Sequence, residues 1–420
     1  MTFGSNAALF PVTAPLSDTA NHERAPGPTR PLTILIAVPT IERGAADEGA
    51  VDLAAILVGA GHHAIVVSTG GRLEQRVVDA GAEFVRLDVA SRNPSRIARN
   101  AARLFALARE RGCDVVHAHG RAAAWSALPA ARMARVPFLT SWYKGFREQN
   151  ALKHLYNAVM ARGERVITPS DQIAELIVAR HGTPWQRIAV IPSAVDIVRF
   201  DPTALTGDRI DAVRRAWGVK DDTKVILVPG RMLRRKGHNV AVQAARRLKE
   251  MGLKNFLFVF AGEEQGRSRY TGELWDLVLA SDTSDVIRMA SHPDDRAAAY
   301  AAAVAVVSAA IQPEGLQRTI LEALAMARPV VVSDLAAGPD IVQAPPAVPE
   351  ERMTGLRFAA GDNEALAAAL IRLLSLPEAA RRAIGRRGRE WVASHCAPAT
   401  VASQMLAVYA AVTEKPAPHR

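Results

Sequence analysis

Short runs of apolar, β-branched residues alternate with longer helical stretches along most of the chain. Strands that alternate with helices predict a parallel sheet covered by helices. The pattern breaks at a stretch rich in turn residues, 196–206, and restarts at Val225. The restart predicts an α/β fold with two doubly wound, Rossmann-like domains, which face a central cleft and bind ligands at the carboxyl ends of their strands. The predicted strands are residues 33–38, 64–68, 84–87, 115–117, 137–140, 166–168 and 188–191 in the first domain, and 225–228, 256–260, 285–289, 304–308 and 330–332 in the second.

The domain boundaries follow from this pattern and from the length of 420 residues, which favours two or three domains. Residues 1–30 contain several prolines and no basic region followed by an apolar core, so we expect a disordered leader. The first domain then spans residues 31–197, and the second spans 198–395. Residues 396–420 are expected to form a tail and a closing helix that can pack back on the first domain. No uninterrupted apolar run reaches the length of a membrane span, so we expect no membrane crossing.

The charge balance is basic, with 52 Lys and Arg residues against 42 Asp and Glu residues and a net charge of +10 at pH 7. This charge permits nucleic acid, anionic lipid or phosphorylated substrates as partners. An aromatic content of 5%, without an RNP-like pattern or zinc-finger spacing, argues against nucleic acid. Cys113 and Cys396 are too few for a disulfide framework and lack metal-ligand spacing. We therefore expect a metal-free site and a reducing, cytoplasmic compartment.

Two glutamates stand in an E-x7-E spacing, Glu314 and Glu322. Gly315 marks a loop, and residues 316–327 have the pattern of a helix. At about 100° per residue, eight residues leave an offset of about 80°, so both carboxylates can face one side of the helix. The free backbone N–H groups near Leu316 attract an anion, and the carboxylates accept bonds from hydroxyls. A sugar nucleotide fits both features; an ordinary helix with a glutamate near each end is the alternative.

A basic loop, P-G-R-M-L-R-R-K-G, follows the strand that opens the second domain. Gly230 begins this loop, and Arg231 and Lys236 lie at the carboxyl end of the strand. The planar fork of an Arg and the compact charge of a Lys can together neutralise a diphosphate. Arg234 and Arg235 lie in the same loop, so a solvated basic loop is the alternative. The strand-end position predicts that the loop and the glutamates share one cleft.

In the first domain, the loop after the first strand contains Gly44 and leads into a helix near residues 51–58. A glycine there lets the backbone approach a phosphate or a sugar, and a plain turn is the alternative. Further on, V-V-H-A-H-G places His117 in a strand and His119 just past its end. A strand-end imidazole can donate to a sugar hydroxyl, although such a pair is more often structural. No third ligand stands at metal spacing.

Two motifs, in order, resemble those of the family 4 glycosyltransferases, a large retaining group with the GT-B fold, and the resemblance spans residues 31–376. G-R-M-L-R-R-K-G resembles the family's G-R-x4-K-G, and E-G-L-Q-R-T-I-L-E-A resembles its E-G-F-G-x3-x-E-A. The resemblance implies that Arg231 and Lys236 hold the donor diphosphate. It also implies that Glu322 binds the ribose, that Glu314 contacts the donor sugar, and that His119 lies beside that sugar. The catalytic candidates are thus Arg231, Lys236, Glu314 and His119, and the substrate-binding candidates are Gly44, Gly230, Gly315, Leu316 and Glu322.

Three loops depart from the usual family pattern. Ala45 replaces the second glycine of a G-G-A-E-R loop. Ser193 and Ala194 stand where Asn-Gly is common, and Ala337 belongs to an Ala-Ala-Gly stretch that replaces a Gly-Gly turn. We expect these changes to reshape the sugar or acceptor pocket, or to alter transfer itself.

The expected activity is a retaining, metal-independent transfer of a sugar from a UDP-sugar or GDP-sugar, without a further cofactor. The expected acceptor is a hydroxyl of an envelope glycan or of a lipid-linked precursor. A sugar-nucleotide epimerase of the same fold is one rival, and a glycan-binding or nucleotide-binding protein without transfer activity is another. A dehydrogenase is disfavoured because no G-x-G-x-x-G follows the first strand.

A basic surface is also predicted in the first domain. Arginines at helical spacing can dock a protein peripherally on an anionic membrane, here at its inner face, and a solvated helix face is the alternative. The residues concerned are Arg92, Arg96, Arg99 and Arg103, together with Lys144, Arg147, Lys153 and His154.

Overall fold

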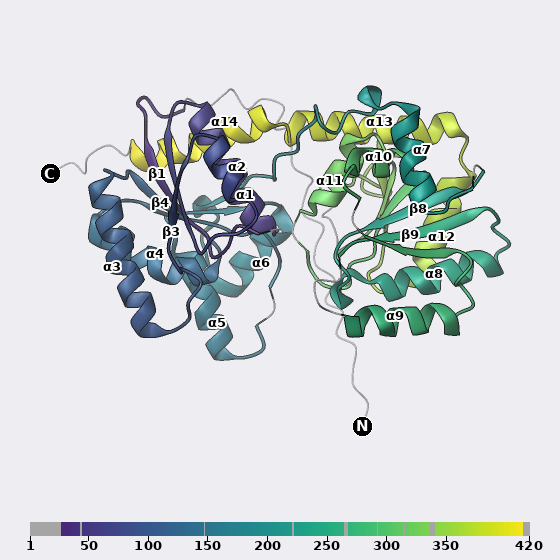
Figure 1. The fold of residues 1–420 in the computed structure, drawn as a ribbon, viewed down its shortest axis with the longest axis horizontal. Coiled ribbons are helices and arrows are strands. Elements are labelled where there is room, and N and C mark those ends of the chain that lie inside the picture. The colour runs from purple at the N-terminus through teal and green to yellow at the C-terminus, as the bar shows by residue number, and fades with distance from the viewer. Residues whose placement is uncertain are drawn as a thin grey trace.

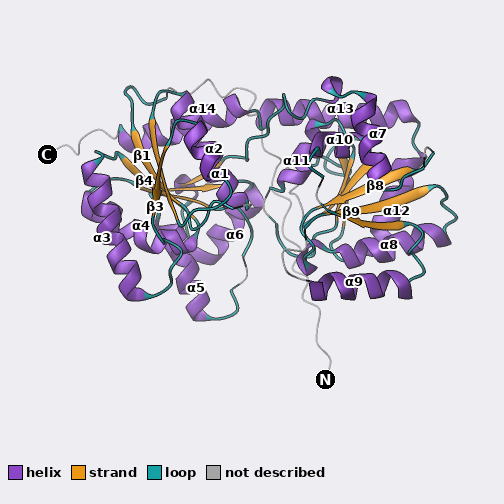
Figure 2. Ribbon diagram, viewed as in Figure 1, coloured by secondary structure: helices purple, strands orange, loops and turns teal. Residues whose placement is uncertain are grey.

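Two lobes lie side by side, each built around a parallel sheet with helices packed on it (Figure 1). The structure is a computed structural model, and it describes residues 27–42, 44–146, 148–220, 222–263, 268–291, 293–314, 316–335 and 341–414. The same view coloured by secondary structure shows strands inside each lobe and helices around them (Figure 2). The predicted α/β class with two doubly wound sheets is confirmed.

The first sheet has seven strands in the order β3-β2-β1-β4-β5-β6-β7, and every neighbouring pair is parallel. The central strands are largely buried because helices cover both faces of the sheet. The strands are β1 (Thr33–Ala37), β2 (His63–Ser68), β3 (Glu83–Arg86), β4 (Val115–His119), β5 (Phe138–Ser141), β6 (Arg165–Thr168) and β7 (Ile188–Val190). The helices are α1 (Ala45–Gly59), α2 (Glu74–Asp79), α3 (Pro94–Glu110), α4 (Arg121–Ala134), α5 (Ala151–Ala158) and α6 (Asp171–His181).

The second sheet has six strands in the order β10-β9-β8-β11-β12-β13, again with parallel neighbours. Its strands are β8 (Lys224–Pro229), β9 (Phe256–Ala261), β10 (Ile287–Ala290), β11 (Ala305–Ser308), β12 (Val330–Ser333) and β13 (Gly355–Phe358). Its helices are α7 (Gly207–Ala216), α8 (His238–Glu250), α9 (Ser268–Ala280), α10 (Arg296–Ala301), α11 (Arg318–Ala325), α12 (Asn363–Ser375) and α13 (Glu378–His395).

The closing helix α14 (Pro398–Thr413) returns to the first lobe, as Figure 1 shows. Val401, Met405 and Tyr409 are buried in the same apolar cluster as β1 and α1. The chain therefore passes between the lobes twice, once between β7 and β8 and once between α13 and α14. The backbone N–H of Val195 donates to the carbonyl of Cys396 at 2.8 Å, which joins the two crossings.

Local sequence sets several helix ends. Asn93 caps α3, and its side chain accepts from the backbone N–H groups of Ser95 and Arg96. Ser170 caps α6, which ends at Gly182 in a left-handed conformation with φ of 61°. These are the usual start and stop signals of a helix, and they fix where the loops around the cleft begin.

Some local predictions were wrong. His119 is the last residue of β4 and does not lie past its end. The strand β13 was not predicted. At the end of the predicted leader, the N–H of Thr29 donates to Glu414 and Arg30 pairs with Asp114, whereas residues 1–26 lie outside the described residues, so the disordered leader stays a prediction.

One helical stretch of the described residues, Glu378–Thr413, is long and apolar enough to cross a membrane by length and composition alone. This stretch consists of α13 and α14, and 33% of its most apolar 18-residue segment is buried in the fold. The apolar side of α14 packs into the core of the first lobe. The absence of a membrane crossing stays a prediction.

Candidate functional site

The basic loop after β8 is held tightly against neighbouring backbone. Gly230 follows the strand directly with φ of 141°, and its carbonyl would lie 1.7 Å from a Cβ at Gly262. Gly237 ends the loop with φ of 69°, and a Cβ there would lie 1.8 Å from the carbonyl oxygen of Ala309. Only glycine fits at such contacts, so the loop has one defined path between β8 and α8.

Lys236 lies at the centre of this loop and is largely buried, with 14% of its side chain exposed. Its Nζ donates to Oε2 of Glu314 at 3.0 Å and to Oε1 of Gln317 at 3.1 Å. Burial, together with the charges of Arg235 and Arg231, lowers the pKa of Lys236 to about 7. The structure thus places a titratable cation beside two more cations, a combination that favours a polyanionic ligand.

The neighbouring arginines contact different partners. Arg235 forms an ion pair with Glu314, whereas Arg234 pairs with Glu273 and stacks over Tyr270. Arg231 lies close enough to Lys236 for its charge to lower the lysine pKa. Arg231, Arg235 and Lys236 therefore belong to the site, and Arg234 points to α9 instead.

The two predicted glutamates do not share one side of a helix, so that prediction was wrong. Glu314 precedes α11, which begins at Arg318, and it binds the basic loop. Glu322 lies within α11, where its Oε1 pairs with Arg296 at 2.9 Å and its Oε2 accepts from the hydroxyl of Tyr300 at 2.9 Å. Burial raises the pKa of Glu322, and Arg296 opposes this effect. The two carboxylates belong to separate networks.

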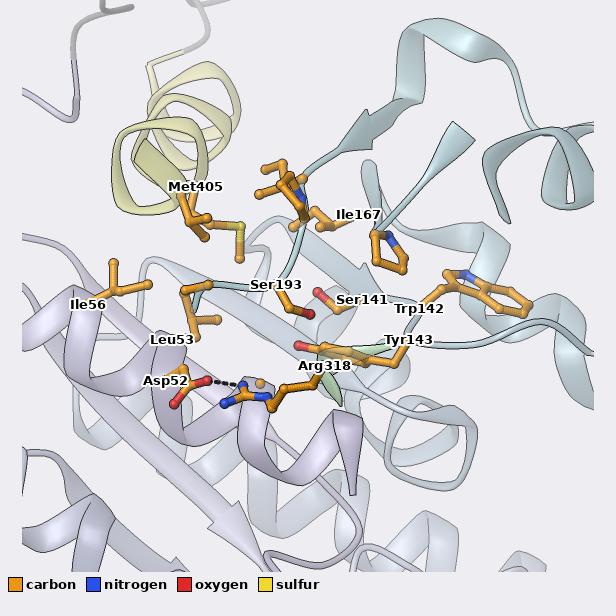
Figure 3. Close-up of a pocket in the computed structure, with 16 residues that line it drawn as sticks. Asp52, Leu53, Ile56, Ser141, Trp142, Tyr143, Ile167, Ser193, Arg318 and Met405 are labelled. Atoms are coloured by element: carbon orange, nitrogen blue, oxygen red, sulfur yellow. Dashed lines mark hydrogen bonds and ion pairs between the residues drawn. The ribbon is translucent and has the colours of Figure 1, made fainter. Parts of the chain in front are cut away.

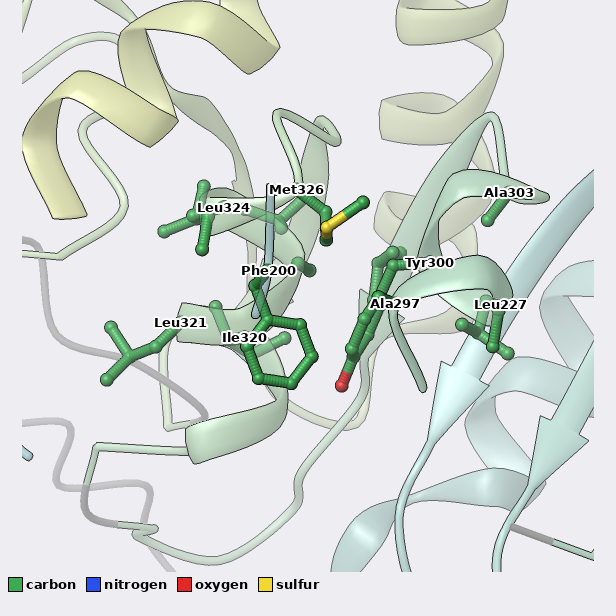
Figure 4. Packing of buried hydrophobic residues seen from close by; sticks show 14 of the residues in the cluster. Phe200, Leu227, Ala297, Tyr300, Ala303, Ile320, Leu321, Leu324 and Met326 are labelled. Atoms are coloured by element: carbon green, nitrogen blue, oxygen red, sulfur yellow. The ribbon is translucent and has the colours of Figure 1, made fainter. Parts of the chain in front are cut away.

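The core around Glu322 explains why this carboxylate is fixed. Tyr300 packs beside Phe200 with ring centroids 6.2 Å apart, among Ile320, Leu321 and other apolar residues (Figure 4). Leu316 also belongs to this core, and its buried side chain precedes the helix by two residues. A ligand near Leu316 could therefore reach only backbone. Gly315 and its predicted role lie outside the described residues.

In the first lobe, the two histidines of β4 have different surroundings. His117 is fully buried, and its Nδ1 and Nε2 lie 2.7 Å from the Tyr409 hydroxyl and 2.8 Å from the Ser141 hydroxyl. His119 is also buried, and its Nδ1 lies 2.8 Å from the Tyr143 hydroxyl. Burial lowers the pKa of His119 to about 3, so this imidazole is neutral near pH 7. His117 ties α14 to the sheet, and His119 lies behind Tyr143.

A partly open pocket lies beside these residues, at the ends of β5, β6 and β7 (Figure 3). Helix α1 contributes Asp52 and Leu53, and α14 contributes Met405. Tyr143 forms part of the wall, so the pocket and His119 are separated by one ring. The pocket combines apolar walls with a few polar groups, as small-molecule sites commonly do.

Arg318 links this pocket to the second lobe. It is the first residue of α11, and its guanidinium lies 3.1 Å from Glu48 and also pairs with Asp52, both on α1 (Figure 3 shows the contact with Asp52). Burial lowers the pKa of Arg318, but the charges of Asp52 and Glu48 outweigh it and raise that pKa overall. This ion-pair group holds the start of α11 against the first lobe.

A second contact between the lobes lies near Glu314. A Cβ added at Gly145, in the loop after β5, would lie 2.7 Å from Pro313. Lys144 stands next to this glycine, and burial together with the charges of Arg235, Arg121 and Arg231 lowers its pKa. Cations from both lobes therefore converge on one region.

The structure brings together four of the predicted residues, Gly230, Arg231, Lys236 and Glu314. Glu322, Leu316 and His119 lie in other networks, and Gly44 caps the start of α1, which the sequence placed too late. Sequence reasoning missed three residues that shape the region, Gln317, Arg318 and Tyr143, and it named Lys144 only as part of a basic surface. Gln317 and Arg318 lie inside the quoted E-G-L-Q-R motif, so the motif could have pointed to them.

Two protein families match the chain and show which family it belongs to. Residues 48–199 match the family described as Glycosyltransferase Family 4, and residues 223–376 match the one described as Glycosyl transferases group 1. The chain belongs to the GT-B glycosyltransferases of the family 4 and group 1 type. The first match covers β2 to β7 and the second covers β8 to β13, and the resemblance inferred from the motifs is confirmed.

Two curated relatives are similar in sequence to part of this chain. The D-inositol 3-phosphate glycosyltransferase of Nocardiopsis dassonvillei is 28% identical over 237 residues, which cover 52% of this chain and 54% of that protein. The protein of the same name from Thermobifida fusca is 28% identical over 251 residues, with 55% and 56% covered. The chain thus spans about half the length of the curated relatives it matches.

Solved structures share the whole GT-B fold. A glycosyltransferase from Rickettsia africae has a TM-score of 0.82 at 24% identity and covers 92% of this chain and 100% of its own. Anabaena HepE in complex with UDP has a TM-score of 0.77 at 18% identity, with 89% and 98% covered. At these identities the likeness shows the fold, and the predicted GT-B fold is confirmed.

The positions that depart from the family pattern have different locations. Ser193 and Ala194 line the pocket, and Ala45 is the first residue of α1. Ala337 lies outside the described residues. The departures at Ser193 and Ala194 therefore change a pocket wall, whereas the charged contacts of Lys236 are unaffected.

Proposed function

We propose that the protein transfers a sugar from a nucleoside-diphosphate sugar to an acceptor hydroxyl. The observation that carries the proposal is the buried Lys236, which Glu314 and Gln317 hold in the loop after β8, beside Arg231 and Arg235. A donor diphosphate offers the negative charge that three clustered cations favour. Family membership supports the same reaction class.

In the proposed mechanism, the donor diphosphate takes the place of Glu314 at Lys236. Glu314 is then free to contact the donor sugar. As the bond between the sugar and the diphosphate breaks, negative charge grows on the leaving group, and Arg231 and Lys236 stabilise it more strongly than they stabilise the ground state. The leaving phosphate accepts the proton of the acceptor hydroxyl on the same face, so the anomeric configuration is retained. The reaction in this form needs neither a metal nor a further cofactor.

The proposed donor carries UDP or GDP. Anabaena HepE has been solved with UDP and with UDP-glucose, which supports a nucleotide sugar here. We propose that the ribose lies near Glu322, where its hydroxyl would share a carboxylate that Arg296 and Tyr300 already orient. His119 would lie beside the donor sugar as a neutral hydrogen-bonding group.

The proposed acceptor side is the pocket of the first lobe. Its wall contains the hydroxyls of Ser141, Tyr143 and Ser193, which can bind a polyhydroxylated acceptor. An envelope glycan or a lipid-linked precursor is the acceptor class that we propose. The curated relatives named D-inositol 3-phosphate glycosyltransferases support a small polyol-like group as a further acceptor class to test.

A peripheral membrane contact forms part of the proposal, with the protein in the cytoplasm at the inner face. Arg96, Arg99 and Arg103 are exposed on α3, and Arg92 stacks over Tyr156 next to α5. Leu152 of α5 is 79% exposed, so basic and apolar side chains lie on neighbouring helices. Each basic residue near an anionic surface contributes about 1 kcal/mol. Arg147 lies outside the described residues.

The reaction is tested first by a thermal-shift panel of UDP, GDP, ADP and their sugars, because a bound ligand stabilises the folded state. The best donor is then incubated with glycan, lipid-linked and inositol-phosphate acceptors, and products are separated by mass spectrometry. Transfer to an acceptor supports the proposal. Conversion of the donor sugar without an acceptor would establish the epimerase, and donor binding without any product would establish the binding protein.

Liposome sedimentation tests the membrane contact. Binding should increase with the anionic lipid fraction, decrease with salt, and weaken when Arg96, Arg99 and Arg103 are changed together to Glu. Binding that depends on neither lipid charge nor salt would contradict it.

A further inference from the structure

Three potential metal ligands converge in the first lobe, near the loop that follows β5. Glu148 lies at the end of this loop, His154 lies on α5, and His181 is the last residue of α6. Nδ1 of His154 lies 2.8 Å from Oε2 of Glu148, and Nε2 of His181 lies 3.3 Å from Oε1 of the same carboxylate. One ligand atom from each residue lies within 4.8 Å of the others.

His181 is the unusual member of this group. Only 2% of its side chain is exposed, and among the described residues neither of its ring nitrogens has a hydrogen-bond partner of good geometry. Buried polar groups are almost always paired, and an unpaired imidazole is costly. Three rings pack against His181: Trp142, Phe146 and His154, at ring-centroid distances of 6.0, 5.5 and 4.8 Å. Its Nε2 remains directed at Glu148.

We propose that Glu148, His154 and His181 form a binding site for a divalent transition metal of the zinc type. Two imidazoles and one carboxylate are a common ligand set for Zn²⁺, and water can occupy a fourth position. Zinc–ligand bonds of about 2.0–2.2 Å require the three ligand atoms to approach slightly, and the half-exposed His154 has room to rotate inward. The metal would also supply the partner that the His181 ring lacks.

The surroundings of the three ligands include one contact that supports a metal site and one charge that opposes it. Nδ2 of Asn157 donates to Oε1 of Glu148 at 3.0 Å, and such an outer contact orients a ligating carboxylate. Arg121 stacks over Trp142 and Phe146, and its positive charge opposes a cation nearby. The carboxylate of Glu148 offsets that charge, so the site depends on Glu148 remaining ionised.

The site has a structural role in this proposal and is separate from the transfer chemistry. Glu148 ends the loop that contains Tyr143 of the pocket wall and Gly145, which lies against Pro313. A metal that joins Glu148 to α5 and α6 would fix this loop beside the cleft. The proposal therefore stands whether or not the proposed transfer reaction is correct.

The test uses the full chain with any affinity tag removed. Isothermal titration with Zn²⁺ should show one saturable site per chain, and Co²⁺ should give visible absorption bands of a tetrahedral nitrogen–oxygen site. Changing the exposed ligand, His154→Ala, should weaken binding by at least about 100-fold, and Asn157→Leu should weaken it by about 10-fold. His395→Ala is the matched control, because His395 is an exposed histidine outside the group, and it should bind as the unmodified protein does.

Two results would overturn the proposal. One is the absence of saturable Zn²⁺ binding, which would mean that the three residues form only a hydrogen-bonded group. The other is unchanged binding in both His154→Ala and Glu148→Gln, which would place the metal elsewhere. Circular dichroism of each variant establishes that the fold is intact before binding is compared.

Discussion

The strand ends of the two sheets carry different kinds of side chain. After β8, cations and a carboxylate meet at Lys236 and Glu314, and Gln317 also accepts from Lys236. At the end of β4, neutral rings and hydroxyls meet instead, with His119 bonded to Tyr143. Charge is stabilised best where it is preorganised, whereas a neutral, shaped surface selects a substrate by fit. We infer that the second lobe provides the stabilisation of the leaving group and that the first lobe selects the acceptor.

The largest expected effect comes from removing the charge of the second lobe. Arg231→Ala together with Lys236→Ala should lower turnover by about 100-fold to 1,000-fold, because the developing charge on the diphosphate loses its donors. Steady-state transfer assays measure the effect. Arg234→Ala is the control, since Arg234 pairs with Glu273 and points away from the site. Near-normal turnover in the double variant would place the diphosphate elsewhere.

The second-largest expected effect is a pH dependence of nucleotide binding, which comes from Lys236 in the second lobe. Lys236 has a lowered pKa of about 7, so it is charged below pH 7 and loses its proton above it. Diphosphate favours the charged form, so the affinity for UDP should fall between pH 7 and 9 by up to about tenfold per pH unit. Calorimetry across this range measures it. Lys236→Arg should remove the dependence because Arg stays protonated, and a wild-type affinity that is flat across the range would contradict the assignment.

Loss of the ion pairs between Arg318 and α1, which connect the two lobes, should reduce transfer more than it reduces nucleotide binding. Arg318→Met breaks the ion pairs with Glu48 and Asp52 and removes one wall of the pocket. We expect turnover with acceptor to fall by about tenfold through misplacement of the acceptor, with UDP affinity unchanged. Arg372→Met is the control, because it breaks an exposed pair with Glu350. Equal losses of UDP binding and transfer would show that the two lobes do not divide their roles this way.

The smallest expected effect concerns the closing helix. Tyr409→Phe removes the hydroxyl that lies 2.7 Å from His117, and the free energy of unfolding should fall by about 1 kcal/mol. Urea unfolding measures this change. Turnover should stay as in the unmodified protein, since His117 has a structural role here. A large loss of turnover without loss of stability would make His117 part of the site.

The sequence predicted most strands of both sheets, because short apolar, β-branched runs that alternate with helices are typical of a covered parallel sheet. It missed β13, whose four residues include Arg357 and follow a segment without helical periodicity. It also placed the start of α1 too late, since the first turn carries Asp47 and Glu48 rather than apolar residues.

The site was predictable in part. The strand-end position of the basic loop predicted that it shares a cleft with the glutamates, and Lys236 contacts Glu314 although the two residues are 78 positions apart. The partners of Glu322 could not be predicted, because Arg296 and Tyr300 reach it from another helix. The pocket includes Met405 of α14, so its shape depends on a packing contact between the two ends of the chain.

The central claim is that the second lobe binds a nucleoside diphosphate through Lys236. Calorimetry of UDP and GDP binding to the unmodified protein, to Lys236→Ala and to Arg234→Ala tests it most directly. We predict that one nucleotide binds the unmodified protein and Arg234→Ala equally well and binds Lys236→Ala at least about tenfold more weakly. Binding of neither nucleotide, or equal binding to all three proteins, would contradict the claim.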